Sequence, residues 1–225
     1  MTQKNRGLVA IFDMDGTLIQ SEAKLRMDVV HTMERLGVQI DHTKVGDDWY
    51  ALAHSYGISK KDFDREFRRR KSWEQSLREG DVSLFPDVYP CLDELLRRGI
   101  QAGVLTRSSA RYTRLKIDHF NLGKYVRNNV EVTPVNKENH PTKEEEALRL
   151  IKKLDLESVT NVYFIGDSPE DVLVAPRVSN RLGIKTQGIY ISRNQVPIPE
   201  AVQNYPIVRS LEEIPGMILG DQNGK

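Results

Sequence analysis

The chain has 225 residues, which suffices for one large domain or for a core with a smaller inserted domain. Its 33 basic and 32 acidic residues give a net charge of +1, so the overall charge offers no support for a nucleic-acid or membrane partner. Cys91 is the only cysteine, which excludes an internal disulfide. No apolar run is long enough for a signal peptide or a bilayer span. This observation and the lack of a possible disulfide favour a cytoplasmic location.

The N-terminal third begins with one strand and continues as a charged helical block. Residues 8–12 (LVAIF) form a continuous apolar run of strand length, typical of a buried parallel strand. Apolar residues at helical spacing predict a helix over residues 21–37 and a second helix within residues 41–56. Ser59 is a helix-capping residue type, so a third helix is expected to begin there and to continue through residues 62–80.

From residue 85 onward strands and helices alternate. The apolar spacing predicts a helix from Val88 to Gly99 with Leu96 on its buried face. Further helices are expected over residues 109–119 and 143–154, and strands over residues 100–106, 161–166 and 184–191. Such alternation predicts an α/β fold with a mostly parallel sheet covered on both faces. The helical block interrupts it, so we expect a core of residues 1–19 and 85–225 with an inserted domain at 20–84.

Acidic and hydroxyl side chains follow three of the predicted strands. Asp13 and Asp15 come after residues 8–12, Thr106 ends the strand over 100–106, and Asp167 and Asp171 follow residues 161–166. The carboxyl ends of parallel strands meet at one edge of a sheet, so these side chains should lie together. Four carboxylates repel one another unless a hard cation sits among them, and oxygen ligands suit Mg²⁺ (magnesium).

The turn after the first strand has the composition of an anion-binding loop. Gly16 permits a close approach of backbone to ligand, and Thr17 adds a hydroxyl group beside the backbone N–H groups of the turn. An aspartate nucleophile, a hard metal ion and an anion-binding turn together predict phosphoryl transfer through a covalent aspartyl-phosphate.

Three segments carry a family resemblance that extends over nearly the whole chain. Residues 13–17 (DMDGT) resemble the DxDGT signature of the haloacid dehalogenase-like (HAD) superfamily. Residues 166–171 (GDSPED) are similar to its GDxxxD motif, and residues 105–107 (LTR) resemble its strand-ending Thr/Ser motif. The resemblance implies a parallel-sheet, Rossmann-like HAD core. The insertion looks like the α-helical cap domain of the subgroup that contains phosphoglycolate phosphatases and β-phosphoglucomutases.

The same resemblance implies roles for the motif residues. Asp13 would attack phosphorus, and Asp15 would protonate the leaving alkoxide and later deprotonate water. Thr106 would hydrogen-bond the transferred phosphoryl group. The Asp13 carboxylate, the Asp15 backbone carbonyl and Asp167 would hold Mg²⁺, and Asp171 would support that site directly or through other groups.

Two positions depart from the family pattern. The family usually places a lysine before a proline between these motifs, whereas here His140 precedes Pro141. Lys143, at the start of a predicted helix, is the favoured replacement, with His140 and Lys137 as alternatives. Arg107 stands where many relatives have Asn, so it either reaches an anionic group of the substrate or forms a surface salt bridge.

The sequence therefore predicts an Mg²⁺-dependent phosphatase that hydrolyses a small phosphorylated metabolite, such as 2-phosphoglycolate or a sugar phosphate. One alternative is a phosphomutase, which uses the same aspartates but transfers the phosphoryl group to a second hydroxyl. Another is an inactive phosphate-sensing or interaction protein on the same scaffold. Dehalogenation is disfavoured because a halide leaving group needs neither Asp15 nor a metal. The substrate remains open, as does the choice between monomer and homodimer.

Overall fold

The computed structural model describes residues 5, 7–46, 48–129, 142–153, 159–193 and 197–223. The chain divides into two compact units, one formed by Met1–Ile19 with Leu84–Lys225 and the other by Gln20–Ser83. Two short strands, β2 (Ile19–Gln20) and β3 (Ser83–Leu84), pair where the chain passes from one unit to the other. In the part of the chain described here, no helix combines the length and the apolar character required to cross a membrane.

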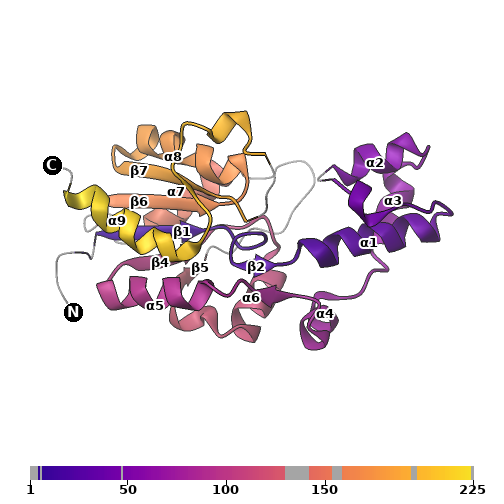
Figure 1. Cartoon of the computed structure of the whole chain (residues 1–225), viewed down its shortest axis with the longest axis horizontal. Coiled ribbons are helices and arrows are strands. Elements are labelled where there is room, and N and C mark those ends of the chain that lie inside the picture. Colours follow the sequence, from indigo (N-terminus) through magenta and orange to yellow (C-terminus); the bar gives the residue numbers. More distant parts are fainter. Residues whose placement is uncertain are drawn as a thin grey trace. The chain divides into compact units, whose positions relative to one another are not determined.

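The larger unit is built on a six-stranded sheet in which every neighbouring pair of strands is parallel (Figure 1). The strand order is β5-β4-β1-β6-β7-β8, so β1 lies between β4 and β6. The strands are β1 (Leu8–Phe12), β4 (Gln101–Val104), β5 (Val126–Asn129), β6 (Asn161–Gly166), β7 (Lys185–Ile191) and β8 (Ile207–Val208). The predicted parallel α/β sheet is confirmed, and β5 and β8 are strands that the sequence pattern did not indicate.

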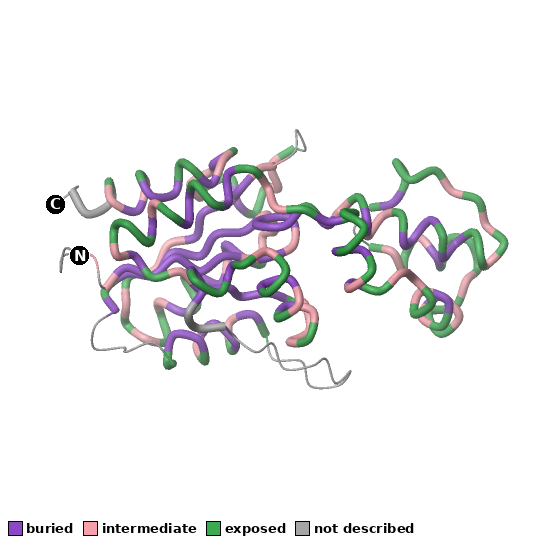
Figure 2. Tube along the Cα trace, turned by 90° about the horizontal axis from the view of Figure 1, so that it is seen from below, coloured by how far each residue is buried: buried purple, intermediate pink, exposed green. Residues whose placement is uncertain are grey.

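Helices cover both faces of this sheet, as Figure 1 shows. They are α5 (Val88–Arg98), α6 (Ala110–His119), α7 (Lys143–Lys153), α8 (Pro169–Leu182) and α9 (Ile214–Asn223), with short 3-10 helices at Leu122–Lys124, Glu200–Val202 and Leu211–Glu213. Helices α7 and α8 pack on one face, where Ile151 and Val178 join Val9 and Ile11 of β1 in one buried cluster. Figure 2 accordingly shows the strands buried along most of their length, with exposed positions on the outer sides of the helices.

Most of the apolar face predicted for α5 is confirmed. Val88, Cys91, Leu92 and Leu95 are buried, and Gly99 ends the helix in the left-handed conformation at φ +74°. The prediction for Leu96 was wrong, because this side chain is 40% exposed. Leu96 lies one helical step, about 100°, beyond Leu95, which carries it off the buried stripe.

The smaller unit is helical, with a core of its own around Val29, Met33 and Phe63. Its helices are α1 (Glu22–Arg35), α2 (Trp49–Ser55), α3 (Lys60–Phe67) and α4 (Trp73–Glu79), with a 3-10 helix at His42–Lys44. Ser59 caps α3 as predicted, since its hydroxyl accepts from the Asp62 N–H at 3.1 Å. The single helix expected through residue 80 was wrong: Ser72 accepts from the Gln75 N–H and starts α4 separately.

Candidate active site

Three neighbouring strands deliver the predicted site residues to one edge of the sheet. Asp13 directly follows β1, Thr106 follows β4, and Asp167 follows β6. Backbone hydrogen bonds continue past the strand ends, because the Asp13 N–H donates to the Ile165 carbonyl at 2.8 Å and the Leu105 N–H donates to the Phe12 carbonyl at 2.8 Å. The parallel register therefore fixes the starting points of all three loops.

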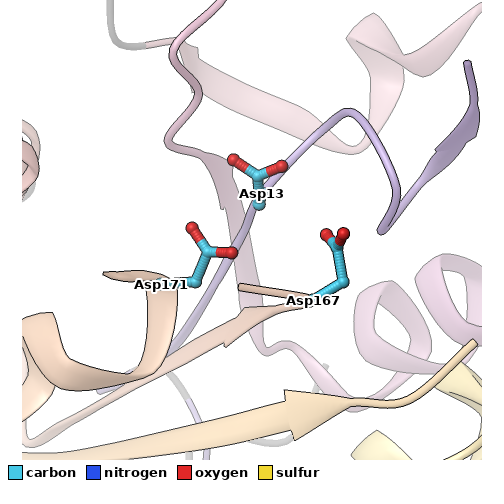
Figure 3. Close-up of side chains that lie close together, drawn as sticks. All are labelled: Asp13, Asp167 and Asp171. Carbon is cyan, nitrogen blue, oxygen red and sulfur yellow. The ribbon is translucent and has the colours of Figure 1, made fainter. Parts of the chain in front are cut away.

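A cluster of three carboxylates lies at this edge. Asp13, Asp167 and Asp171 each offer one oxygen, and these oxygens lie within 4.8 Å of one another. Figure 3 shows that Asp13 projects from the end of β1 and that the other two project from the chain after β6. The structure thus brings together the three side chains that the sequence predicted as metal ligands from two motifs more than 150 residues apart.

The turn between β1 and β2 requires glycine at position 16. Gly16 has a φ of +83°, and a Cβ atom at this position would lie 2.2 Å from Oδ2 of Asp167. Thr17 is fully buried, and its hydroxyl donates to Oδ1 of Asp167 at 2.6 Å. This turn therefore holds the Asp167 carboxylate in place, and the partner of the Thr17 hydroxyl in the structure is that carboxylate.

Lys143, the first residue of α7, reaches into the acidic cluster. Its Nζ donates to Oδ1 of Asp13 at 2.8 Å and also contacts Oδ1 of Asp171, and its side chain is only 6% exposed. Burial alone would lower the pKa of the Lys143 ammonium group, but the carboxylates of Asp13 and Asp171 outweigh it and hold this pKa above its ordinary value. The alternatives Lys137 and His140 lie outside the described residues.

Burial acts in the opposite sense on Asp13. It raises the pKa of the Asp13 carboxyl well above its ordinary value of 3.8, and the nearby Lys143 ammonium opposes this rise. The adjacent charges of Asp171 and Asp167 raise the pKa further. A cation among these carboxylates would favour their ionised forms. The cluster is therefore electrostatically suited to bind a cation.

Asp171 is held in place at both of its oxygens. Oδ2 accepts from the Ser168 N–H at 2.9 Å and from the Ser168 hydroxyl at 2.7 Å, while Oδ1 contacts Lys143. These contacts cap the N-terminus of α8 and leave Asp171 oriented toward the lysine. Gly166 makes the arrangement possible, since a Cβ there would lie 2.3 Å from the Asp171 carboxyl group.

Asp15 points to a different partner, which the sequence reasoning missed. Lys116 of α6 donates to its two carboxylate oxygens at 2.7 Å and 2.6 Å, and the Ser108 hydroxyl donates to Oδ2 at 2.7 Å. One signal was available: Lys116 lies one helical turn after Thr113, so a lysine follows Thr113 on a face of α6 that is buried.

Thr106 and Arg107 follow β4 but differ in their surroundings. Thr106 is 4% exposed, and its hydroxyl accepts from the Ser108 N–H at 3.1 Å, which tightens the loop. Arg107 is 53% exposed and pairs with Glu170 through two nitrogen atoms. The guanidinium of Arg107 thus forms the surface salt bridge that was one of its two expected roles.

The parallel sheet, the inserted helical unit and the acidic cluster after β1 and β6 define a class of α/β hydrolase. The family model described as haloacid dehalogenase-like hydrolase matches residues 10–188, which include the inserted helical unit, the acidic cluster and most of the sheet. The chain therefore belongs to the haloacid dehalogenase-like hydrolase family and is an enzyme of the hydrolase class. No curated protein sequence matches the chain significantly.

Solved structures share this fold at low sequence identity. A protein from Clostridium difficile that is predicted to be a phosphatase is 18% identical, with 96% of this chain and 100% of that chain covered and a TM-score of 0.71. A predicted phosphoglycolate phosphatase from Haemophilus somnus is 16% identical, with 96% and 99% covered and a TM-score of 0.67. A protein from Thermotoga maritima predicted to be a β-phosphoglucomutase is 19% identical, with 95% and 99% covered and a TM-score of 0.64.

Proposed function

We propose that this chain is a phosphatase that hydrolyses the phosphate monoester of a small molecule through a phosphorylated Asp13. The observation that carries the proposal is the pairing of Asp13 with Lys143 beside two further carboxylates, at the end of the central strand. A nucleophilic carboxylate needs a neighbouring cation to accept a phosphoryl group, which is itself negatively charged. The similarity to structures predicted to be phosphatases supports the same reaction.

The carboxylates of the cluster fit a hard divalent cation, and we propose Mg²⁺. Asp13, Asp167 and the backbone carbonyl of Asp15 would hold it, and when bound it would neutralise charge on the phosphoryl oxygens. Asp171 would orient Lys143, because its own oxygens already accept from Ser168 and contact that lysine. This assignment uses only oxygen donors, which Mg²⁺ prefers.

The first half of the proposed reaction transfers the phosphoryl group to the protein. An oxygen of Asp13 forms a bond to phosphorus while the bond from phosphorus to the leaving alkoxide breaks. Asp15 gives its proton to that alkoxide, which leaves as an alcohol. Lys143 would balance the charge on the transferred group, and Thr106 with the backbone N–H group of Thr17 would position it, since the Gly16 N–H already donates to the Ile19 carbonyl.

The second half restores the carboxylate. Asp15, now ionised, takes a proton from a water molecule as the water oxygen bonds to phosphorus. The bond between phosphorus and Asp13 breaks, and inorganic phosphate leaves. Arg107 would bind a second anionic group of the substrate only after its salt bridge with Glu170 opens, so its part in recognition is the least direct.

We also propose that the helical unit of residues 20–83 is a cap domain that selects the substrate. Its separate core and its insertion between β1 and β4 support a role as an independent body. A cap favours a small phosphorylated metabolite over a phosphoprotein, since a large substrate does not fit beneath one. We propose further that the protein acts in the cytoplasm as a monomer or homodimer. Its proposed partner is the small substrate, with no nucleic acid or membrane.

Substitution of Asp13 tests the central step. Asp13→Asn keeps the shape of the side chain but removes the nucleophilic oxygen anion, so turnover of p-nitrophenyl phosphate with Mg²⁺ should disappear while the far-UV circular dichroism stays unchanged. Mass spectrometry after rapid quenching should detect a phosphorylated peptide containing residue 13 in the wild-type chain only. Turnover near the wild-type rate in Asp13→Asn would remove Asp13 from the nucleophile role.

A phosphomutase is the second candidate, and the similarity to the Thermotoga maritima structure favours it. A mutase keeps the phosphorylated aspartate until a second hydroxyl accepts the group, so a hexose 1-phosphate would yield a hexose 6-phosphate. Product analysis by phosphorus NMR separates the two reactions, because a phosphatase yields inorganic phosphate. The best support for an inactive phosphate sensor was that the family's lysine is missing before Pro141. The pairing of Lys143 with Asp13 supplies such a cation and therefore supports a catalytic protein.

A further inference from the structure

Lys116 is a fully buried lysine that the proposed reaction does not use. Its side chain is 0% exposed, and Nζ lies 2.7 Å and 2.6 Å from the two oxygens of Asp15 and 3.2 Å from Oγ of Ser108. A charged group is stable in such a place only when it is paired and hydrogen-bonded. The contacts with Asp15 and Ser108 satisfy that requirement, so they fix the position of the ammonium group.

The position of Lys116 in α6 explains how it reaches Asp15. Helical side chains tilt toward the N-terminus of their helix, and Ser108 lies two residues before Ala110, the first residue of α6. Thr113, one helical turn before the lysine, and Ile117, the residue after it, are both buried. The aliphatic stem is therefore packed, and the ammonium group meets the loop that follows β4.

Two different lysines serve the two aspartates of the first motif. Lys143 contacts Asp13, and Lys116 contacts Asp15. Lys143 thus balances the charge of the nucleophile, while the hydrogen bonds of Lys116 to both Asp15 oxygens serve the second aspartate of the pair. Asp15 uses one oxygen for proton transfer in the proposed reaction. Lys116 donates to both oxygens and Ser108 to Oδ2 alone, so these donors hold the orientation of the whole carboxylate.

We propose that Lys116 is the positioning residue of Asp15 and that the Ser108 hydroxyl assists it. The inference rests on the proposed function, in which Asp15 is the general acid and base. Lys116 keeps its own protons throughout and donates hydrogen bonds to the carboxyl group. The proton that reaches the leaving alkoxide comes from the Asp15 oxygen turned to the substrate. Without the ammonium group the carboxylate rotates among several orientations, and the protonation of a poor leaving group slows.

The test compares two substrates that differ in their need for a proton. An aliphatic phosphate monoester such as 2-phosphoglycolate has a poor leaving group that requires protonation, whereas p-nitrophenolate leaves from p-nitrophenyl phosphate without it. Lys116→Met removes the ammonium and keeps the length of the side chain. It should lower kcat/KM for the aliphatic ester by about 10²-fold or more, with a much smaller loss for p-nitrophenyl phosphate.

Two controls isolate the role of Lys116. Lys143→Met should lower kcat/KM for both substrates by similar factors, because that cation acts on the phosphoryl charge common to them. In an Asp15→Asn background, adding Lys116→Met should cause no further loss on the aliphatic ester, since the group that Lys116 positions is already gone. A further loss as large as in the wild-type background would contradict the proposal.

The outcomes separate this inference from the proposed function. If the wild-type protein turns over both substrates and Lys116→Met loses kcat/KM equally on both, the positioning role is overturned. The proposed phosphatase function is unaffected by that result. Absence of wild-type turnover on every phosphate ester overturns the phosphatase itself and the inference with it. If thermal melting shows that Lys116→Met does not fold, Ser108→Ala replaces it, and the same unequal loss in smaller size is expected; an equal loss overturns the role.

Discussion

Replacement of Lys143 by methionine removes the cation beside the proposed nucleophile and keeps the length of the side chain. Nζ lies 2.8 Å from Oδ1 of Asp13, so at an effective dielectric constant of about 20 the Coulomb attraction is about 6 kcal/mol. Withdrawal of both charges from water offsets much of this attraction. Breaking a buried pair on one side nevertheless costs about 3–5 kcal/mol of stability, because the remaining charge stays buried.

The same substitution should slow catalysis. Loss of one preorganised electrostatic contact to developing charge lowers kcat about 10²–10³-fold, and we expect this range for Lys143→Met on p-nitrophenyl phosphate with saturating Mg²⁺. Urea unfolding followed by circular dichroism measures the loss of stability in parallel. Lys152→Met is the matched control, since Lys152 is an exposed lysine of the same helix and should leave both quantities unchanged.

The result that would refute this reasoning is a variant with nearly wild-type kcat. Such an outcome would show that the contact between Lys143 and Asp13 has no part in turnover, and attention would pass to Lys137 and His140. A variant that loses stability but keeps kcat would assign Lys143 a structural role only.

Three further predictions concern the metal, the turn and the start of α5. Chelation with EDTA should abolish turnover and added Mg²⁺ should restore it, because it removes the ion proposed to neutralise charge on the phosphoryl oxygens; activity in EDTA would refute the metal assignment. Gly16→Ala should weaken Mg²⁺ binding in calorimetry, since its Cβ would lie 2.2 Å from Asp167 at a φ of +83°; wild-type affinity would contradict this. Burial raises the pKa of Asp87, but Arg193 and the Leu211 N–H outweigh it and hold this pKa below 3.8. The stabilisation from Asp87 is therefore present at neutral pH and lost as the pH falls through the lowered pKa. Asp87→Asn should cost about 3–5 kcal/mol at pH 7, and urea unfolding at a series of lower pH values should show this cost shrinking; a cost independent of pH would contradict this.

The continuous apolar runs made the central strands predictable. Residues 8–12 and 161–166 are buried on both faces of a parallel sheet, and such strands carry an unbroken apolar signal. The edge strand β8 has two residues and β5 carries the polar segment VRNN, so neither shows that signal. The break between α3 and α4 escaped prediction because Arg68, Arg69, Arg70 and Lys71 are good helix formers, and only the cap at Ser72 marks the new start.

The candidate site was predictable where adjacent residues carry its chemistry. Asp13 and Asp167 were predicted because each directly follows a buried strand. The family resemblance called for a lysine between the motifs, and Lys143 was favoured over Lys137 and His140 because it begins a predicted helix. The contact between Lys116 and Asp15 joins residues 101 positions apart, and nothing near either residue in the sequence indicates the other. Pairings of this kind depend on how far α6 lies from β1, which only the packed sheet determines.

The sheet order sets a schedule for synthesis on the ribosome. β1 is made first, yet its two neighbours are β4 and β6, which begin at Gln101 and Asn161. In the growing chain the apolar segment of β1 therefore has no partner strand until the whole helical insertion and then β4 have been synthesised. This delay leaves an apolar segment exposed in the nascent chain. We therefore expect chaperone binding or aggregation to begin at β1.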